Sequence, residues 1–170
     1  MTVITLSPAL DTHDVLRLAG TVLTAGAAAT VAFDFFGQSI SPALGFASLA
    51  PVPLANAVIN TVFGAPFTPG AHALHYMAGL LAYPLGWLLI VDPLRRRLAP
   101  ALPWAAAAVG YGVTLWIFAL YIMAHLIAGM PAFLGFTGIT WVALVGHVVF
   151  ALVAAGVFRL RDTEIAFRRP

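Results

Sequence analysis

The sequence predicts an all-α, polytopic membrane protein whose four transmembrane helices form a bundle. Of its 170 residues, 62% are hydrophobic and only 8% are charged, whereas a soluble domain carries roughly 25% charged residues. No Asp, Glu, Lys or Arg occurs between Leu98 and Phe158. Such a chain cannot cover itself with a water-compatible surface, so lipid is its natural solvent. We expect residues 1–170 to form a single membrane domain in contact with the lipid bilayer.

The first two membrane spans are expected at 16–37 and 72–91. A helix needs about 20 mainly apolar residues to cross the hydrocarbon of a bilayer, and both stretches meet this requirement. In the first span, Gly20, Thr24 and Ala28 recur at intervals of four residues. Small residues in this pattern let a neighbouring helix approach closely, so we expect this face to pack against another span.

Prolines help to place the other boundaries. Pro84 should kink the second span, because it removes a backbone hydrogen bond from the helix. Asp92-Pro93 should end that span, since the residue before a proline disfavours helical geometry. The third and fourth spans are expected at 104–129 and 138–158.

The arginines predict the orientation. A four-span model puts every basic residue on one side of the membrane, whereas the connections 38–71 and 130–137 contain no charged residue. Arginine-bearing segments stay in the cytoplasm by the positive-inside rule. We therefore expect both termini, including the tail 159–170, to be cytoplasmic. The basic residues are Arg17, Arg95, Arg96, Arg97, Arg159, Arg161, Arg168 and Arg169.

The long outer loop 38–71 is apolar yet rich in proline and glycine, which is unusual for a solvated loop. Residues 53–63 could form a short helix with Asn56 and Asn60 on one face. We expect this helix to lie in the membrane interface or against the bundle. A re-entrant segment is the alternative, although its irregular backbone would need partners inside the membrane.

Ionisable side chains gather toward the outer end of the predicted bundle. Asp34, His72, His75 and His125 all fall within about one turn of that end, at a rise of about 1.5 Å per residue. Ionisable groups inside a membrane are functional candidates because their burial is costly. Together these four could ligate copper(II), zinc or iron through nitrogen and oxygen.

Two other interpretations of the histidines remain open. His75 and His125, at similar depths on different helices, could be the axial ligands of haem b, with His147 as a deeper candidate near the midplane. Without a cofactor, the histidines would hydrogen-bond across helices to Tyr76, Tyr121 or backbone carbonyls. A Tyr121–His147 bond is one such pair.

No catalytic residue is predicted. The chain has no cysteine, which excludes disulfides, zinc–thiolate sites and iron–sulfur clusters held by thiolates. It also lacks a P-loop, a Gly-x-Ser-x-Gly elbow and a His-Glu-x-x-His motif. The basic residues do not interleave with aromatic residues as in a nucleic-acid surface. These absences favour a non-catalytic protein that binds no nucleic acid.

Four motifs resemble those of a family of small, uncharacterised four-helix integral membrane proteins from bacteria. The similarity extends over about residues 75–158 and implies a four-span topology in the bacterial inner membrane. The long outer loop and the additional His72 and His125 depart from the pattern. The matching residues are His75-Tyr76-Met77-Ala78-Gly79, Arg95 to Arg97, Gly129-Met130-Pro131 and His147-Val148-Val149-Phe150.

The leading functional hypothesis is an accessory subunit or assembly partner of a membrane redox complex, in which the outer histidines hold haem or a metal. Small-residue and aromatic helix faces suit packing against a membrane-protein partner or a second copy of the chain. A rival hypothesis is a small transporter or channel for a neutral or weakly charged solute, motivated by Pro84, Asp34 and His147. A third is a purely structural membrane protein.

Overall fold

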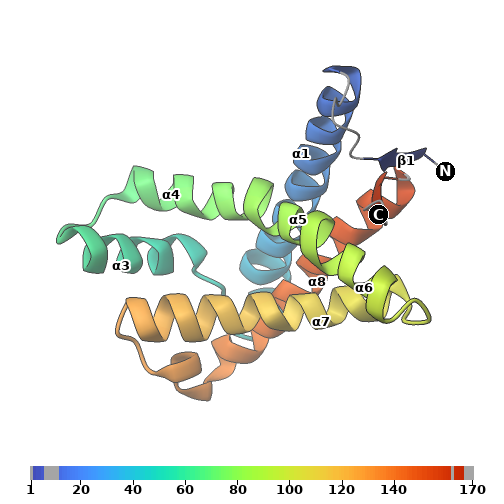
Figure 1. Ribbon diagram of the computed structural model, residues 1–170. Coiled ribbons are helices and arrows are strands. Elements are labelled where there is room, and N and C mark those ends of the chain that lie inside the picture. The colour runs from blue at the N-terminus through green and yellow to red at the C-terminus, as the bar shows by residue number, and fades with distance from the viewer. Residues whose placement is uncertain (1, 6–11, 162, 167–170) are drawn as a thin grey trace.

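Four long apolar helices confirm the four-span prediction. The computed structural model describes residues 2–5, 12–161 and 163–166, with side chains placed within 12–161. The spans are Thr12–Ala43, Thr68–Leu98, Trp104–Ile127 and Gly138–Leu160, arranged as in Figure 1. Two short strands, β1 (Thr2–Thr5) and β2 (Thr163–Ala166), pair in parallel beside the helices.

The first two spans are longer than expected. Span one runs through α1 (Thr12–Phe35), the π-helical η1 (Phe36–Ile40) and α2 (Ser41–Ala43). Span two begins at Thr68, not His72, and contains α4 (Thr68–Met77), η2 (Ala78–Ala82), α5 (Tyr83–Gly86), η3 (Trp87–Val91) and α6 (Asp92–Leu98). At about 1.5 Å per residue each exceeds the roughly 30 Å of bilayer hydrocarbon.

The prediction that span two ends at Asp92-Pro93 is wrong, because the helix continues into α6. A π-helical segment ends two residues before each of three prolines: η1 before Pro42, η2 before Pro84 and η3 before Pro93. A proline ring clashes with the carbonyl four residues earlier in a regular α-helix. The wider π turn relieves this clash, so the helix passes each proline.

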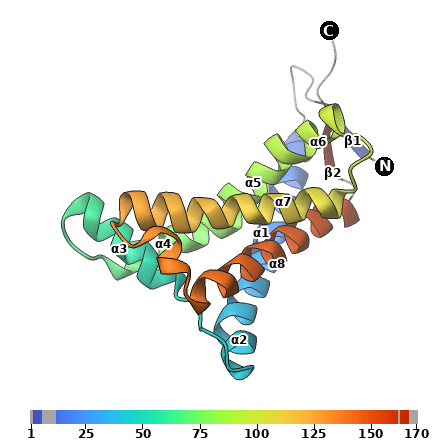
Figure 2. The ribbon, with the colours of Figure 1, turned by 90° about the horizontal axis from the view of Figure 1, so that it is seen from below.

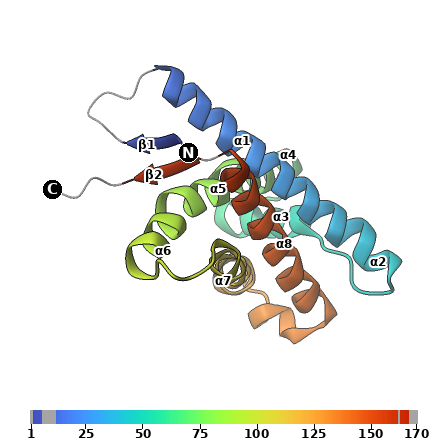
Figure 3. The same ribbon diagram turned by 90° about the vertical axis from the view of Figure 1, so that its right-hand side faces the viewer.

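The last two spans place α8 at the centre of the bundle. Span three joins α7 (Trp104–Ile117) to the π-helical η4 (Phe118–Ile127), and the 3₁₀ segment η5 (Ala132–Phe136) leads into α8 (Gly138–Leu160). Half of the apolar window of α8 is buried, against a third or less in the other spans. It packs against both α1 and α7, as Figure 3 shows.

The predicted small-residue face of span one is rotated by about one residue. Gly20 has open space around its Cα, and Thr24 is exposed. The buried face instead includes Ala25, Gly26 and Ala29. A Cβ on Gly26 would collide with the carbonyl of Leu80, so α1 and η2 meet backbone to backbone there, the close approach that glycine allows in membranes.

The outer connection contains the helix α3 (Pro51–Phe63), two residues longer than predicted. Figures 1 and 2 show α3 beside α4, and it also contacts η4. Ala55 and Val58 are buried in this contact, whereas Phe63 is exposed. The side chain of Asn56, in α3, accepts a 2.8 Å hydrogen bond from the N–H of Phe67, the residue before α4. This bond connects α3 to the start of α4. The helix therefore packs along the bundle.

The described arginines lie at one end of the bundle. The start of α1, the helix α6 and the end of α8 share that end (Figure 3), and these segments carry Arg17, Arg95 to Arg97, Arg159 and Arg161. Arg168 and Arg169 lie outside the described residues. The arrangement agrees with the predicted asymmetry, and the cytoplasmic assignment of this end remains a prediction.

Candidate functional site

Asp34 and His75 form a hydrogen-bonded contact between the first two spans. The Nε2 atom of His75, on α4, lies 3.2 Å from both carboxylate oxygens of Asp34, on α1. Gln38 lies one turn beyond Asp34 and donates a 2.9 Å hydrogen bond from its amide to Oδ1. The side chains of His75 and Asp34 are 13% and 25% exposed. The structure therefore joins two of the four predicted metal ligands.

The other two predicted ligands lie apart from this pair. His72 is exposed and stacks on Tyr76, with ring centroids 6.2 Å apart. His125 donates from Nδ1 to the Met130 carbonyl at 2.7 Å, at the C-terminal end of its own span. Within residues 12–161, no three His, Cys, Asp or Glu side chains are grouped as metal ligation would require. The predicted four-ligand metal site is therefore not assembled in the described part of the chain.

His147 is buried near the middle of α8, and its hydrogen-bond partner differs from the predicted one. Its Nδ1 atom lies 2.7 Å from the Ala143 carbonyl, one turn earlier, and its ring meets Phe33 edge-on at 5.0 Å. Among the described residues, Tyr121 and His147 do not form the predicted hydrogen bond. The Tyr121 side chain is 38% exposed and packs against His125 on η4.

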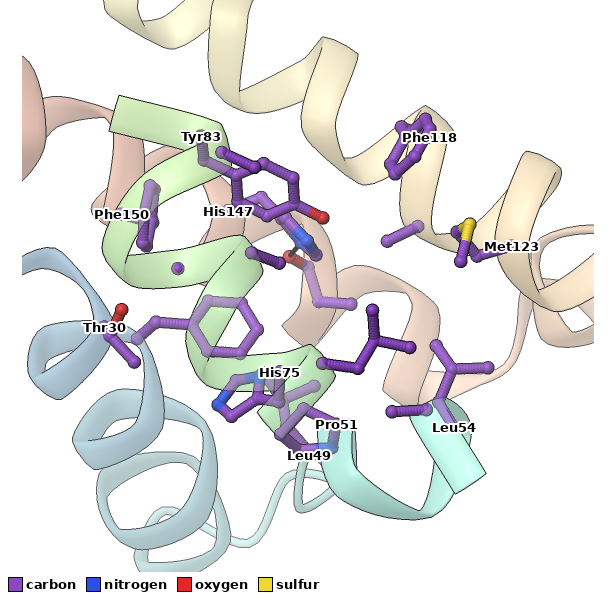
Figure 4. A pocket seen from close by; sticks show the side chains of 18 of the residues that line it. Thr30, Leu49, Pro51, Leu54, His75, Tyr83, Phe118, Met123, His147 and Phe150 are labelled. Atoms are coloured by element: carbon purple, nitrogen blue, oxygen red, sulfur yellow. Dashed lines mark hydrogen bonds between the residues drawn. The ribbon is translucent and has the colours of Figure 1, made fainter. Parts of the chain in front are cut away.

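His75 and His147 line one large apolar cavity. Its volume is about 640 Å³, and its walls come from α1, the segment before α3, α3 itself, α4 to α5, η4, η5 and α8. Figure 4 shows the two imidazoles on different walls of this space. Apart from these rings, only Thr30 and Tyr83 among the lining residues carry a polar side chain. The cavity thus offers a few polar groups in an otherwise hydrocarbon surface.

Thr30 is the polar group that sequence analysis missed. Its Oγ1 atom is buried and has no hydrogen-bond partner, and it faces Gly79 so closely that a Cβ there would collide with it. By contrast, Thr21 and Thr24 donate to the carbonyl one turn earlier in the same helix. A buried hydroxyl without a partner is costly, and this one is enclosed between α1 and η2 against Gly79.

The cavity reaches the apolar surface of the bundle. Three large side chains of its lining are also exposed: Leu74 at 38%, Met77 at 54% and Phe118 at 37%. These side chains lie on α4 and η4, within the second and third spans. Exposed apolar surface on helices that are long and apolar enough to cross a membrane is expected to face lipid in a bilayer.

The participation of α3 and of Phe33 in these walls had no clear signal in the sequence. The unusual apolar character of 38–71 indicated that the outer connection would not be an ordinary loop, but not that it would close a cavity. Comparison of the chain with protein-family models, with curated proteins and with solved structures found no match. The family resemblance described above therefore remains a prediction, and the functional argument rests on the geometry.

Proposed function

We propose that this protein binds a largely apolar, uncharged small molecule that enters its cavity from the bilayer. The cavity carries the proposal: its volume of about 640 Å³ falls in the range of about 300–1,000 Å³ typical of small-molecule sites. Such sites combine apolar walls with a few placed polar groups, and here those groups are His75, His147 and Tyr83.

An uncharged ligand suits these walls better than haem b. Two of the predicted haem ligands, His75 and His147, do line the cavity, whereas His125 does not. Haem b carries two propionates, and no arginine or lysine is among the lining residues. The described arginines lie at the opposite end of the bundle. Buried carboxylates without such partners are strongly disfavoured.

Binding also suits the packing better than passage through the membrane. A solute crossing from the cavity to the arginine end would meet a close-packed cluster that includes Val22, Trp87, Leu88, Ala108 and Phe158, all less than a tenth exposed. We therefore favour a binding protein over a transporter. Its role as an accessory subunit of a membrane redox complex remains a prediction, for which a lipid-soluble ligand would be appropriate.

The proposal predicts that filling the cavity abolishes binding. The probes are tritiated para-nonylphenol and its methyl ether, and retention by protein in lipid nanodiscs is measured above that of empty nanodiscs. Ala119→Trp, in the cavity wall, should lower retention of a bound probe at least about tenfold, a change of about 1.4 kcal/mol. Ala106→Trp is the matched control because Ala106 is exposed on α7 and lies outside the cavity.

Three results would contradict the proposal. The first is that neither probe is retained above empty nanodiscs. The second is that Ala119→Trp binds the probes as well as the unchanged protein does. The third is that the purified protein shows a Soret band that His75→Ala and His147→Ala abolish. The last result would restore the haem hypothesis, and the first would favour a purely structural protein.

A further inference from the structure

We infer that the ligand of this cavity presents a hydroxyl group, as a hydrogen-bond donor, to the cavity histidines. This inference rests on the proposed function and names its ligand class: an apolar molecule with a phenolic or alcoholic hydroxyl. It follows from the hydrogen bonds that the two imidazoles already make. Those bonds determine which ring nitrogens carry protons and which are left to meet a ligand.

His147 has one nitrogen committed to the backbone. A carbonyl oxygen only accepts, so the 2.7 Å contact between Nδ1 and the Ala143 oxygen places a proton on Nδ1. No carboxylate among the described residues pairs with this buried ring, and an isolated imidazolium would be costly to bury. The ring is therefore neutral, and its Nε2 atom is an acceptor.

Asp34 determines which nitrogen of the His75 ring carries the proton. Both carboxylate oxygens lie 3.2 Å from Nε2, so Nε2 donates and, in the neutral ring, Nδ1 is left as an acceptor. Gln38 holds the carboxylate from its other side. Asp34 is thus a positioning residue for His75 and does not itself line the cavity.

The two acceptors belong to rings that line the same cavity from different walls (Figure 4). Both imidazoles contact the Phe33 ring, with ring centroids 6.4 Å apart for His75 and 5.0 Å apart for His147. Among the described residues, no hydrogen bond reaches the Nε2 of His147 or the Nδ1 of His75. A ligand hydroxyl can donate to one of them, whereas an ether or ketone oxygen cannot.

Para-nonylphenol and its methyl ether test this inference, because they differ in the hydroxyl proton and one methyl group. After subtraction of empty nanodiscs, the protein should retain the phenol about tenfold more strongly than the ether. His147→Phe or His75→Phe should bring this ratio close to one, with little effect on the ether. His125→Phe is the control, since His125 lies outside the cavity and should leave the ratio unchanged.

The outcomes separate the inference from the function on which it rests. Equal retention of phenol and ether by the unchanged protein would overturn the inference while supporting the binding function. An unchanged ratio in both cavity variants would also overturn it. Retention of neither probe would overturn the binding function itself. The comparison of phenol and ether in the unchanged protein does not depend on the folding of any variant. For each variant, size-exclusion chromatography shows whether it elutes as a single species or as an aggregate.

Discussion

Polar side chains within the spans mostly bond to carbonyls, and two of these bonds connect helices. Tyr111 donates to the Tyr83 carbonyl at 2.7 Å, and Trp116 donates from Nε1 to the Thr140 carbonyl at 3.0 Å. Together they attach α7 to α5 on one side and to α8 on the other. Such bonds contribute about 0.6 kcal/mol each inside a membrane, up to about 2. They fix the relative rotation of helices whose apolar faces have little other specificity.

At the arginine end, one carboxylate serves two guanidinium groups. Asp92 bonds to Arg95 at 2.9 Å and to Arg96 at 2.7 Å, and its own side chain is 11% exposed. Asp92→Asn would remove the carboxylate charge that both guanidinium groups share. We expect a loss of about 2 kcal/mol in the free energy of unfolding, since Arg96 is partly solvated and breaking a fully buried pair costs about 3–5 kcal/mol.

Thermal unfolding in detergent, followed by circular dichroism, measures this change. Arg97→Gln is the control because Arg97 is exposed on the same turn, and we expect it to cost less than about 0.5 kcal/mol. If Asp92→Asn is no more destabilising than Arg97→Gln, the pairs of Asp92 contribute nothing to stability.

At the scale of elements, the existence of all four long helices could be predicted, but the ends of only the last two could be. Composition and length identified the spans at 104–129 and 138–158 to within two residues of the observed ends. Pro93 was misinterpreted as a terminator, because a proline is compatible with a continuing helix when a π turn precedes it. Nothing in the residues 87–91 distinguishes a π turn from an α turn. The error therefore comes from backbone geometry that local sequence does not encode.

The turn between the last two spans adopts an unusual left-handed conformation. Phe133, Leu134 and Phe136 have φ of 49°, 54° and 54°, and Gly135 has φ of 70°. This conformation costs about 1–2 kcal/mol for each residue with a Cβ. The turn is held by the hydroxyl of Thr140, which donates to the Phe133 carbonyl. Leu134 thereby reaches the cavity wall.

Gly135→Ala should lower the free energy of unfolding by about 1 kcal/mol, because alanine at this φ is strained. The space around Gly135 is open, so the loss would come from backbone conformation and not from collision. Gly156→Ala, at an equally open position within α8, should cause no loss, since alanine favours a helix. Equal unfolding midpoints for the two variants in the same detergent would show that the turn carries no such strain.

For the whole molecule, sequence reasoning succeeded where charge and hydropathy decide the outcome. The arginines predicted which helix ends lie together, and the structure places the described ones at one end. Sequence reasoning failed for the site, because almost every face of these helices is apolar. Hydrophobic periodicity therefore cannot show which face turns toward the interior of the bundle. Of the four residues grouped by predicted depth, Asp34 and His75 are in contact. His72 is exposed, and His125 bonds to the Met130 carbonyl. Rotation about a helix axis is thus the missing information.

The opening of the cavity beside Leu74, Met77 and Phe118 has a thermodynamic consequence. A molecule that enters there is already dissolved in hydrocarbon, so its occupancy follows its mole fraction among the lipids and not its aqueous molarity. Diluting a fixed amount of protein and para-nonylphenol with additional lipid vesicles should therefore lower occupancy in proportion to the added lipid. Additional buffer should have little effect. Filter retention across both dilution series measures the difference, and equal sensitivity to the two dilutions would show that the bilayer is not the main reservoir from which the probe is bound.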